Sequence, residues 1–97
     1  MNWYVYMVRC SDNSLYTGMT NNVAARVKAH NSEKYGAKYT KKRQPVHLVY
    51  VSGPFPTKSL VMKEEYRIKR KVYKPEKEAM VRVWQTTHPG GLDDLQL

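Results

Sequence analysis

The 97-residue chain contains a single cysteine, Cys10, which excludes an internal disulfide and a cysteine-rich zinc site. Its longest apolar run covers residues 3–8, well short of the roughly 20 residues that a membrane-spanning helix needs. No basic leader followed by an apolar stretch and a small-residue cleavage site opens the chain. We therefore expect no secretory signal and a reducing, cytoplasmic environment.

Several common catalytic motifs are also missing. The sequence has no Gly-rich phosphate loop, no G-x-S-x-G and no H-E-x-x-H pattern. Catalysis by a Cys–His pair would depend on Cys10, for which the sequence identifies no histidine partner.

Acidic residues are scarce, and the resulting positive charge indicates what kind of partner the chain binds. Eight Asp and Glu face 17 Lys and Arg, which gives a formal charge of +9. Residues 26–43 contain seven Lys or Arg and one acid, and residues 63–74 contain six against two. Such segments favour a nucleic acid, and an anionic membrane is less favoured because no bulky apolar face lies opposite the charges. A merely solvated surface is the alternative.

The order of the elements is predicted to be β-β-α-β-α-α, in a small α+β domain with a three-stranded sheet flanked by helices. We expect the domain to cover residues 1–84 and residues 85–97 to form a flexible tail. Residues 31–44 read as a basic loop. The expected strands lie near 3–9, 14–20 and 46–52, and the expected helices near 22–31, 58–73 and 75–83.

The first two strands are expected to form an antiparallel hairpin that carries Tyr6 and Tyr16. Both residue numbers are even, so the side chains share a face only if paired residue numbers sum to an even value. That condition needs a loop with an odd residue count or a bulge. Tyrosines in strands are ordinarily core residues, so these two need further support as site residues.

Glu65 is the most informative anomaly of the long helix. On ideal geometry it lies about 40° from the centre of the stripe formed by Val61, Ile68 and Val72, with Glu64 about 60° away on the other side. A carboxylate beside a core stripe needs a cation or a paired partner. Glu65 is therefore either an ion-paired surface residue or a ligand for Mg²⁺.

Arg26 and His30 are four residues apart and lie along one edge of the stripe expected in the first helix. Arginine presents a planar fork that matches phosphate, and histidine can accept or donate a proton near neutrality. An exposed helix edge without function is the alternative for both residues.

Together these features resemble the GIY-YIG nuclease domain, over roughly residues 3–82. Residues 4–6 (Tyr-Val-Tyr) stand where the family has Gly-Ile-Tyr, and residues 16–18 (Tyr-Thr-Gly) where it has Tyr-Ile-Gly. Arg26 and His30 fall in the next helix and Glu65 in the later one, as the family pattern asks. The resemblance is closest to small stand-alone bacterial members, whose function is poorly defined.

The resemblance implies a hydrolytic endonuclease that uses one divalent cation, Mg²⁺ or another, to cleave phosphodiester bonds. Glu65 would hold the metal, and Arg26 would neutralise charge on the phosphate. Tyr6 or Tyr16 would orient or deprotonate the attacking water, with His30 as a proton relay. The sequence does not choose between the two tyrosines.

Nucleic acid is the expected partner, with DNA favoured over RNA and with structured or damaged DNA of repair and recombination as the expected substrate. A second hypothesis is a binding module for DNA or RNA that keeps the fold without catalysis. A third is a structural partner in a larger repair complex. The residues expected to contact nucleic acid are Lys28, Lys38, Lys41, Lys42, Arg43 and Lys69.

Overall fold

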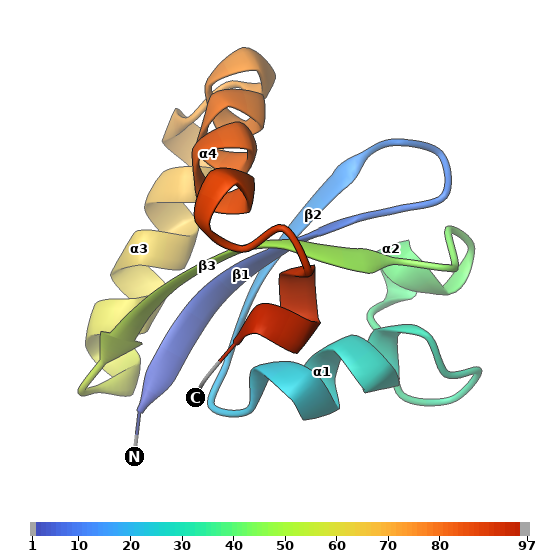
Figure 1. The fold of residues 1–97 in the computed structure, drawn as a ribbon. Coiled ribbons are helices and arrows are strands. Elements are labelled where there is room, and N and C mark those ends of the chain that lie inside the picture. Colours follow the sequence, from blue (N-terminus) through green and yellow to red (C-terminus); the bar gives the residue numbers. More distant parts are fainter. Residues whose placement is uncertain (1, 96–97) are drawn as a thin grey trace.

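The computed structural model describes residues 2–95, which form a three-stranded antiparallel sheet with helices around it (Figure 1). Strand β1 (Trp3–Arg9) lies in the centre, between β2 (Leu15–Thr20) and β3 (His47–Phe55). This architecture confirms the predicted α+β class. The remaining elements are α1 (Val23–His30), α2 (Lys38–Lys41), α3 (Lys58–Lys71), α4 (Lys74–Thr87) and the 3-10 helix η1 (Gly91–Asp94).

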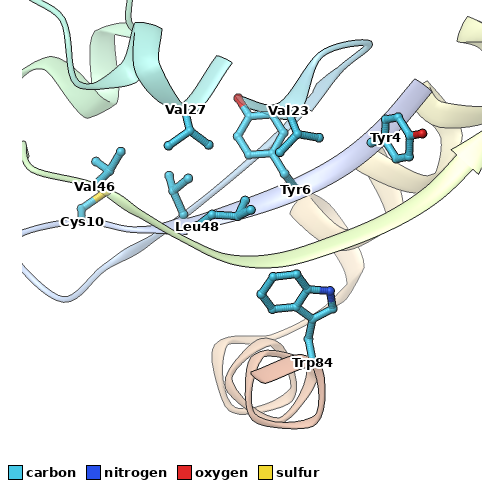
Figure 2. Packing of buried hydrophobic residues seen from close by; sticks show 9 residues of the cluster. Tyr4, Tyr6, Cys10, Val23, Val27, Val46, Leu48 and Trp84 are labelled. Carbon is cyan, nitrogen blue, oxygen red and sulfur yellow. The ribbon is translucent and has the colours of Figure 1, made fainter. Parts of the chain in front are cut away.

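Successive side chains of β1 point to opposite faces, so α1 packs against one face and α3 against the other, while α4 contributes Trp84 to one cluster and Val81 to the other. The core therefore divides into two clusters, and β1 is covered on both faces, as its unbroken apolar run predicts. On one face, drawn in Figure 2, the cluster includes Tyr4, Tyr6, Val8, Val23 and Val27. On the other face it includes Val5, Met7, Val61, Ile68 and Val72.

The helix boundaries follow local chemistry that is visible in the sequence. The side chain of Asn22 caps α1 by accepting a hydrogen bond from the backbone N–H of Ala25 at 3.1 Å. Thr57 caps α3 in the same way, accepting from Leu60. Pro75 lies in the first turn of α4, where its missing N–H costs no hydrogen bond.

Strand β3 continues to Phe55, three residues beyond the predicted end at 52. The prediction stopped at Gly53 and Pro54 because proline cannot donate a ladder hydrogen bond. Here β3 is an edge strand, where a proline is tolerated, and the β1–β3 register shifts between the pairs of Trp3 and Val5.

The C-terminal part of the chain has more regular structure than expected. Helix α4 extends to Thr87, beyond the predicted end at 83, and η1 follows within the segment expected to be a flexible tail. Leu92 and Leu95 pack against the first core cluster. Flexibility of residues 85–97 stays a prediction, and Gln96 and Leu97 lie outside the described residues.

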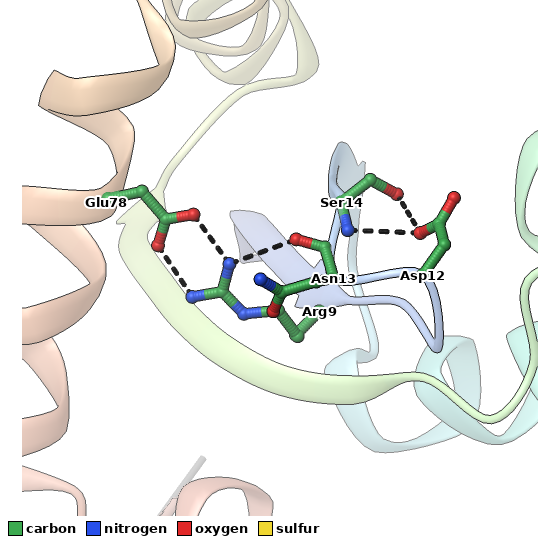
Figure 3. A network of polar contacts seen from close by, with 5 residues as sticks. All are labelled: Arg9, Asp12, Asn13, Ser14 and Glu78. Carbon is green, nitrogen blue, oxygen red and sulfur yellow. Dashed lines mark hydrogen bonds and ion pairs between the residues drawn. The ribbon is translucent and has the colours of Figure 1, made fainter.

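An ion pair fastens the end of β1 to α4 (Figure 3). The Arg9 guanidinium donates from both terminal nitrogens to the Glu78 carboxylate, at 2.6 Å each. Nearby, the Asp12 carboxylate accepts from the backbone N–H of Ser14 and shapes the hairpin loop.

No helix within residues 2–95 has both the length and the apolar character needed to cross a bilayer.

Candidate active site

The register of the hairpin places Tyr6 and Tyr16 on one face of the sheet. Tyr6 pairs with Gly18 and Val8 pairs with Tyr16, so paired residue numbers sum to an even value. The connecting loop, residues 10–14, has the odd residue count that this register requires. The two tyrosines are diagonal neighbours on adjacent strands, which confirms the prediction that they share a face.

Gly18 lies opposite Tyr6 because the phenol ring occupies the space of a side chain at that position. A Cβ built on Gly18 would lie 2.6 Å from Cζ of Tyr6, closer than carbon atoms approach. The glycine therefore lets the Tyr6 ring lie across the strand and project toward α1, the direction seen in Figure 2.

His30, at the end of α1, is completely buried, although the sequence placed it at the edge of the apolar stripe. Its Nε2 lies 2.6 Å from the Tyr6 hydroxyl, and its Nδ1 lies 2.8 Å from the hydroxyl of Thr40. The His30 ring also packs edge-on against Tyr16, with the centroids 5.2 Å apart. Burial, with the nearby Arg26 charge, lowers the pKa of His30 to about 4, so the imidazole is neutral at physiological pH.

Arg26 lies one turn before His30 on α1, and its guanidinium interacts with the phenols of both Tyr6 and Tyr16. One guanidinium nitrogen donates to the backbone carbonyl of Tyr35 at 3.2 Å. Burial raises the pKa of Tyr6 to about 12, although the Arg26 charge acts to lower it. Burial likewise raises the pKa of Tyr16, so both phenols are protonated near neutral pH.

Glu65 approaches the tyrosines from α3, next to the edge strand β2. Its charge acts on both Tyr6 and Tyr16, and its neighbour Lys69 lies over the Tyr16 ring at 5.3 Å from the centroid. The structure thus brings Tyr6, Tyr16, Arg26, His30 and Glu65 together from β1, β2, α1 and α3.

The Glu65 carboxylate has spare coordination capacity. Its side chain is 23% exposed, and its ion pair with Lys69 is long, at 3.9 Å. Glu64 is equally exposed, at 24%, but Arg67 donates to both of its oxygens at 2.7 and 2.9 Å. The adjacent glutamates of α3 therefore differ in what remains free to bind a ligand.

A divalent cation fits this arrangement if the substrate and water supply most of its ligands. Within residues 2–95, no group of three or more His, Cys, Asp or Glu side chains could enclose a metal. Mg²⁺ is commonly held by one or two carboxylates together with substrate phosphates and water. Glu65, half-buried and loosely paired, suits that mode.

The expected nucleic-acid-binding residues differ in their surroundings. Lys28 is exposed on α1, and Lys69 points over Tyr16 from α3. Lys38, Lys41 and Lys42 are exposed at α2, next to a surface hollow that is partly lined by Lys38, Tyr39 and Lys42.

Arg43 is already engaged within the protein. Its guanidinium donates to Asp12 at 2.9 Å and to the backbone carbonyl of Tyr39 at 2.9 Å. It also lies 3.9 Å over the Tyr39 ring. These contacts join the loop after α2 to the β1–β2 hairpin, so Arg43 has less freedom to reach a phosphate than the neighbouring lysines.

The segment 31–44, predicted to be a basic loop, contains a short helix that contributes to the site. Its residues 38–41 form the one-turn helix α2, which places Thr40 against His30 and stacks Tyr39 on Tyr16, with the centroids 5.8 Å apart. No local periodicity signals one turn of helix. The burial of Thr40 within a highly charged segment cannot be predicted without knowing that it contacts His30.

Comparison with known proteins places these residues in a wider setting. A family model described as the GIY-YIG catalytic domain matches residues 2–79, which include all five residues of the candidate site. A UPF0213 protein of Staphylococcus haemolyticus is 61% identical over 66 residues, 68% of this chain and 78% of that protein. A UPF0213 protein of Staphylococcus aureus is 58% identical over the same shares. The solution NMR structure of a UPF0213 protein from Bacillus halodurans is 41% identical, with a TM-score of 0.54 over 97% of this chain and 92% of that one.

Proposed function

The chain belongs to the GIY-YIG catalytic domain family, a family of nucleases, and on that basis we propose that it is a Mg²⁺-dependent endonuclease. The proposed reaction is hydrolysis of phosphodiester bonds in DNA, with branched or damaged DNA of repair and recombination as the substrate. The net charge of +9 supports a polyanionic substrate.

The observation that carries the proposal is the state of Glu65. Two other glutamates, Glu64 and Glu78, each accept two hydrogen bonds from an arginine, at 2.6–2.9 Å. Within residues 2–95, the ion pair of Glu65 is the 3.9 Å contact with Lys69, although Glu65 is half-buried and its charge acts on two phenols. A module that only binds nucleic acid has no use for a weakly paired carboxylate there, because it repels phosphate.

Arg26 binds the scissile phosphate in this mechanism. Its guanidinium can donate in a planar fork to phosphate oxygens, and its charge opposes the negative charge that develops during attack. Because Arg26 also interacts with the two phenols, the phosphate is held next to the hydroxyl groups that bind the attacking water.

Tyr6 and Tyr16 orient the attacking water, and both are protonated before the reaction because burial raises their pKa values. A protonated phenol can accept the water's proton only as it passes its own proton to another group. Tyr6 has such a neighbour, since the imidazole of His30 lies 2.6 Å from its hydroxyl.

Glu65 would hold the cation, which when bound polarises the phosphoryl oxygen and stabilises the leaving oxygen. Lys69 would release its long contact with Glu65 and remain available for a neighbouring phosphate.

Cleavage of labelled single-stranded, duplex and branched DNA, and of matched RNA, tests the proposal with Mg²⁺ or with EDTA. We expect cleavage of DNA that requires the metal, and Glu65→Gln should lower it by orders of magnitude while leaving DNA binding intact. Folding stability should change little or rise slightly, because an acid beside an apolar stripe has become neutral.

Glu64→Gln is the matched control, since it makes the same chemical change one residue away and should cleave normally. Equal cleavage by Glu65→Gln and the wild type would assign the activity to another site or to a contaminant. If the wild type binds DNA but never cleaves with any metal or substrate, the chain is a non-catalytic binding module.

A further inference from the structure

A chain of buried hydrogen bonds runs from the Tyr6 phenol into the protein interior. The Tyr6 hydroxyl contacts Nε2 of His30 at 2.6 Å, and Nδ1 of His30 contacts the Thr40 hydroxyl at 2.8 Å. The Thr40 hydroxyl in turn donates to the backbone carbonyl of Ala37 at 3.0 Å. All three side chains are fully buried, with 0% of each exposed.

The donors and acceptors of this chain can be assigned by asking which arrangement satisfies every buried group. The Tyr6 hydroxyl is buried, so its proton needs an acceptor, and the nearby Arg26 guanidinium has only donors to offer. Among residues 2–95, the acceptor at the phenol is Nε2 of His30. His30 must then carry its proton on Nδ1 and donate it to Thr40, whose hydroxyl proton goes to Ala37.

The opposite tautomer leaves a buried group without a partner. With the proton on Nε2, His30 would donate to the Tyr6 oxygen, and the phenol proton would have no hydrogen-bonded acceptor among residues 2–95. The one contact that favours this tautomer is the backbone N–H of Ala37, which is 3.4 Å from Nδ1 and belongs to a half-buried residue. That contact is long compared with the 2.6 and 2.8 Å contacts of the first arrangement.

Hydrogen bonds from the neighbouring segment hold the backbone of His30 and the end of α1 in place. The Gln44 amide donates to the backbone carbonyls of His30 and Ser32, at 2.9 and 2.7 Å, which holds the end of α1. Asn31 exchanges two hydrogen bonds with Val46, at 3.0 and 2.7 Å. The end of α1 and the segment containing α2 are therefore fastened together, and Thr40 meets Nδ1 in a defined position.

We propose that Thr40 is a positioning residue that keeps Nε2 of His30 unprotonated, so that the Tyr6 proton points to His30 and the Tyr6 oxygen faces the attacking water. This rests on the proposed nuclease function and deepens it. It also selects Tyr6 rather than Tyr16 as the proton acceptor, because Tyr6 alone of the two has a bound imidazole.

The proton step balances with the groups present. As the water oxygen bonds to phosphorus, its proton moves to Tyr6 and the Tyr6 proton moves to Nε2. His30 becomes an imidazolium that still donates from Nδ1 to Thr40. The bond from phosphorus to the leaving oxygen breaks, and that oxygen takes its proton from solvent while His30 later returns its proton through Tyr6.

The decisive measurement is the tautomer of His30, read from the ¹⁵N shifts of its ring nitrogens by NMR, with His30→Gln identifying the signal. We expect the proton on Nδ1 in the wild type. In Thr40→Val, which keeps the side-chain shape and removes the acceptor, the Nε2-protonated tautomer should become dominant. A wild-type ring protonated on Nε2 overturns the proposal, whether or not the protein is a nuclease.

Kinetics give the second arm. Thr40→Val should lower kcat by about 10- to 100-fold with KM nearly unchanged, the size expected when an orienting partner is lost. Thr40→Ser should restore both the rate and the tautomer, and Thr86→Val, an exposed Thr→Val change in α4, should leave both unaltered. Wild-type kcat in Thr40→Val with a changed tautomer would refute the catalytic role of the chain. If Thr40→Val does not fold, the wild-type and Thr40→Ser tautomers still decide the assignment.

Discussion

Two regions of the molecule contain an arginine and a glutamate from distant parts of the sequence, and they use them in opposite ways. At the end of β1, Arg9 and Glu78 form a bidentate pair at 2.6 Å (Figure 3). At the candidate site, Arg26 and Glu65 lie around the same tyrosines, but within residues 2–95 no ion pair joins them. The first pair joins two elements of the fold, whereas the second two charges, under the proposed function, bind a phosphate and a cation.

The difference is created by the elements that carry the residues. Arg9 and Glu78 lie on β1 and α4, and their partly buried side chains meet directly. Arg26 reaches the tyrosines from α1, whereas α3 packs on the other face of β1, so Glu65 approaches beside edge strand β2. The sheet edge thus separates Arg26, the proposed phosphate-binding group, from Glu65, the proposed metal ligand, while both act on the same phenols.

The largest contrast is expected between Arg26→Ala, which should impair cleavage, and Arg9→Ala, which should impair folding stability. Arg26→Ala should lower kcat for DNA cleavage about 100- to 1,000-fold, because it removes a charge that opposes developing negative charge on the phosphate. Mg²⁺ binding should survive, since Glu65 is untouched. The measurements are single-turnover cleavage and calorimetric titration of the metal.

Arg9→Ala is the matched variant in the structural region. It should lower the free energy of unfolding by about 1–2 kcal/mol, because the partly buried Glu78 loses its partner, and cleavage per folded molecule should be normal. Reversed outcomes, with Arg9 controlling the rate and Arg26 the stability, would contradict the division between the two regions.

The sequence predicted the elements whose signals are local. The shared face of Tyr6 and Tyr16 follows from the parity of the register, and the helix stripe of Val61 and Ile68 follows from a period of 3.6. The burial of His30 did not follow, because it depends on α2, a single turn positioned by tertiary contacts. In α4, Val81 is buried whereas Val83 is exposed, because the contact with β3 decides which side of the helix faces the core.

As the pH falls, the two regions should lose their contributions to folding stability one after the other. The folded-state pKa of His30 is about 4, below its ordinary 6.5, so the unfolded chain binds more protons between these values. Stability from a neutral His30 is complete above pH 6.5 and is lost as the pH falls toward 4. The Arg9 hydrogen bond lowers the pKa of Glu78 below 4.5, so the contribution of that pair is lost only at lower pH.

Denaturant unfolding across pH 3–8 measures both steps. His30→Gln should flatten the loss of stability between pH 6.5 and 4, and Glu78→Gln should leave that loss and reduce the one below pH 4.5. An unchanged profile for His30→Gln would mean that folding leaves the pKa of His30 at its ordinary value, which would contradict a buried, neutral imidazole.

The smallest expected effect extends the same contrast to the basic surface. If DNA binding neutralises about five phosphates, log K should fall with log[salt] with a slope of about −4 to −5. The sequence alone predicts that Lys41→Ala and Arg43→Ala each reduce this slope by about one unit if they contact phosphate. The structure distinguishes them, since Lys41 is exposed whereas Arg43 is bound to Asp12 and lies over Tyr39. We therefore expect the full unit for Lys41→Ala and a smaller change for Arg43→Ala, measured by fluorescence anisotropy on one duplex between low and moderate salt.

Because Asp12→Asn frees Arg43 without adding a positive side chain, it should steepen the slope slightly in the wild-type background and leave it unaltered in Arg43→Ala. Equal slopes for Lys41→Ala and Arg43→Ala would show that Arg43 leaves Asp12 to bind phosphate, and that an internal ion pair at this exposed position does not withhold an arginine from the substrate.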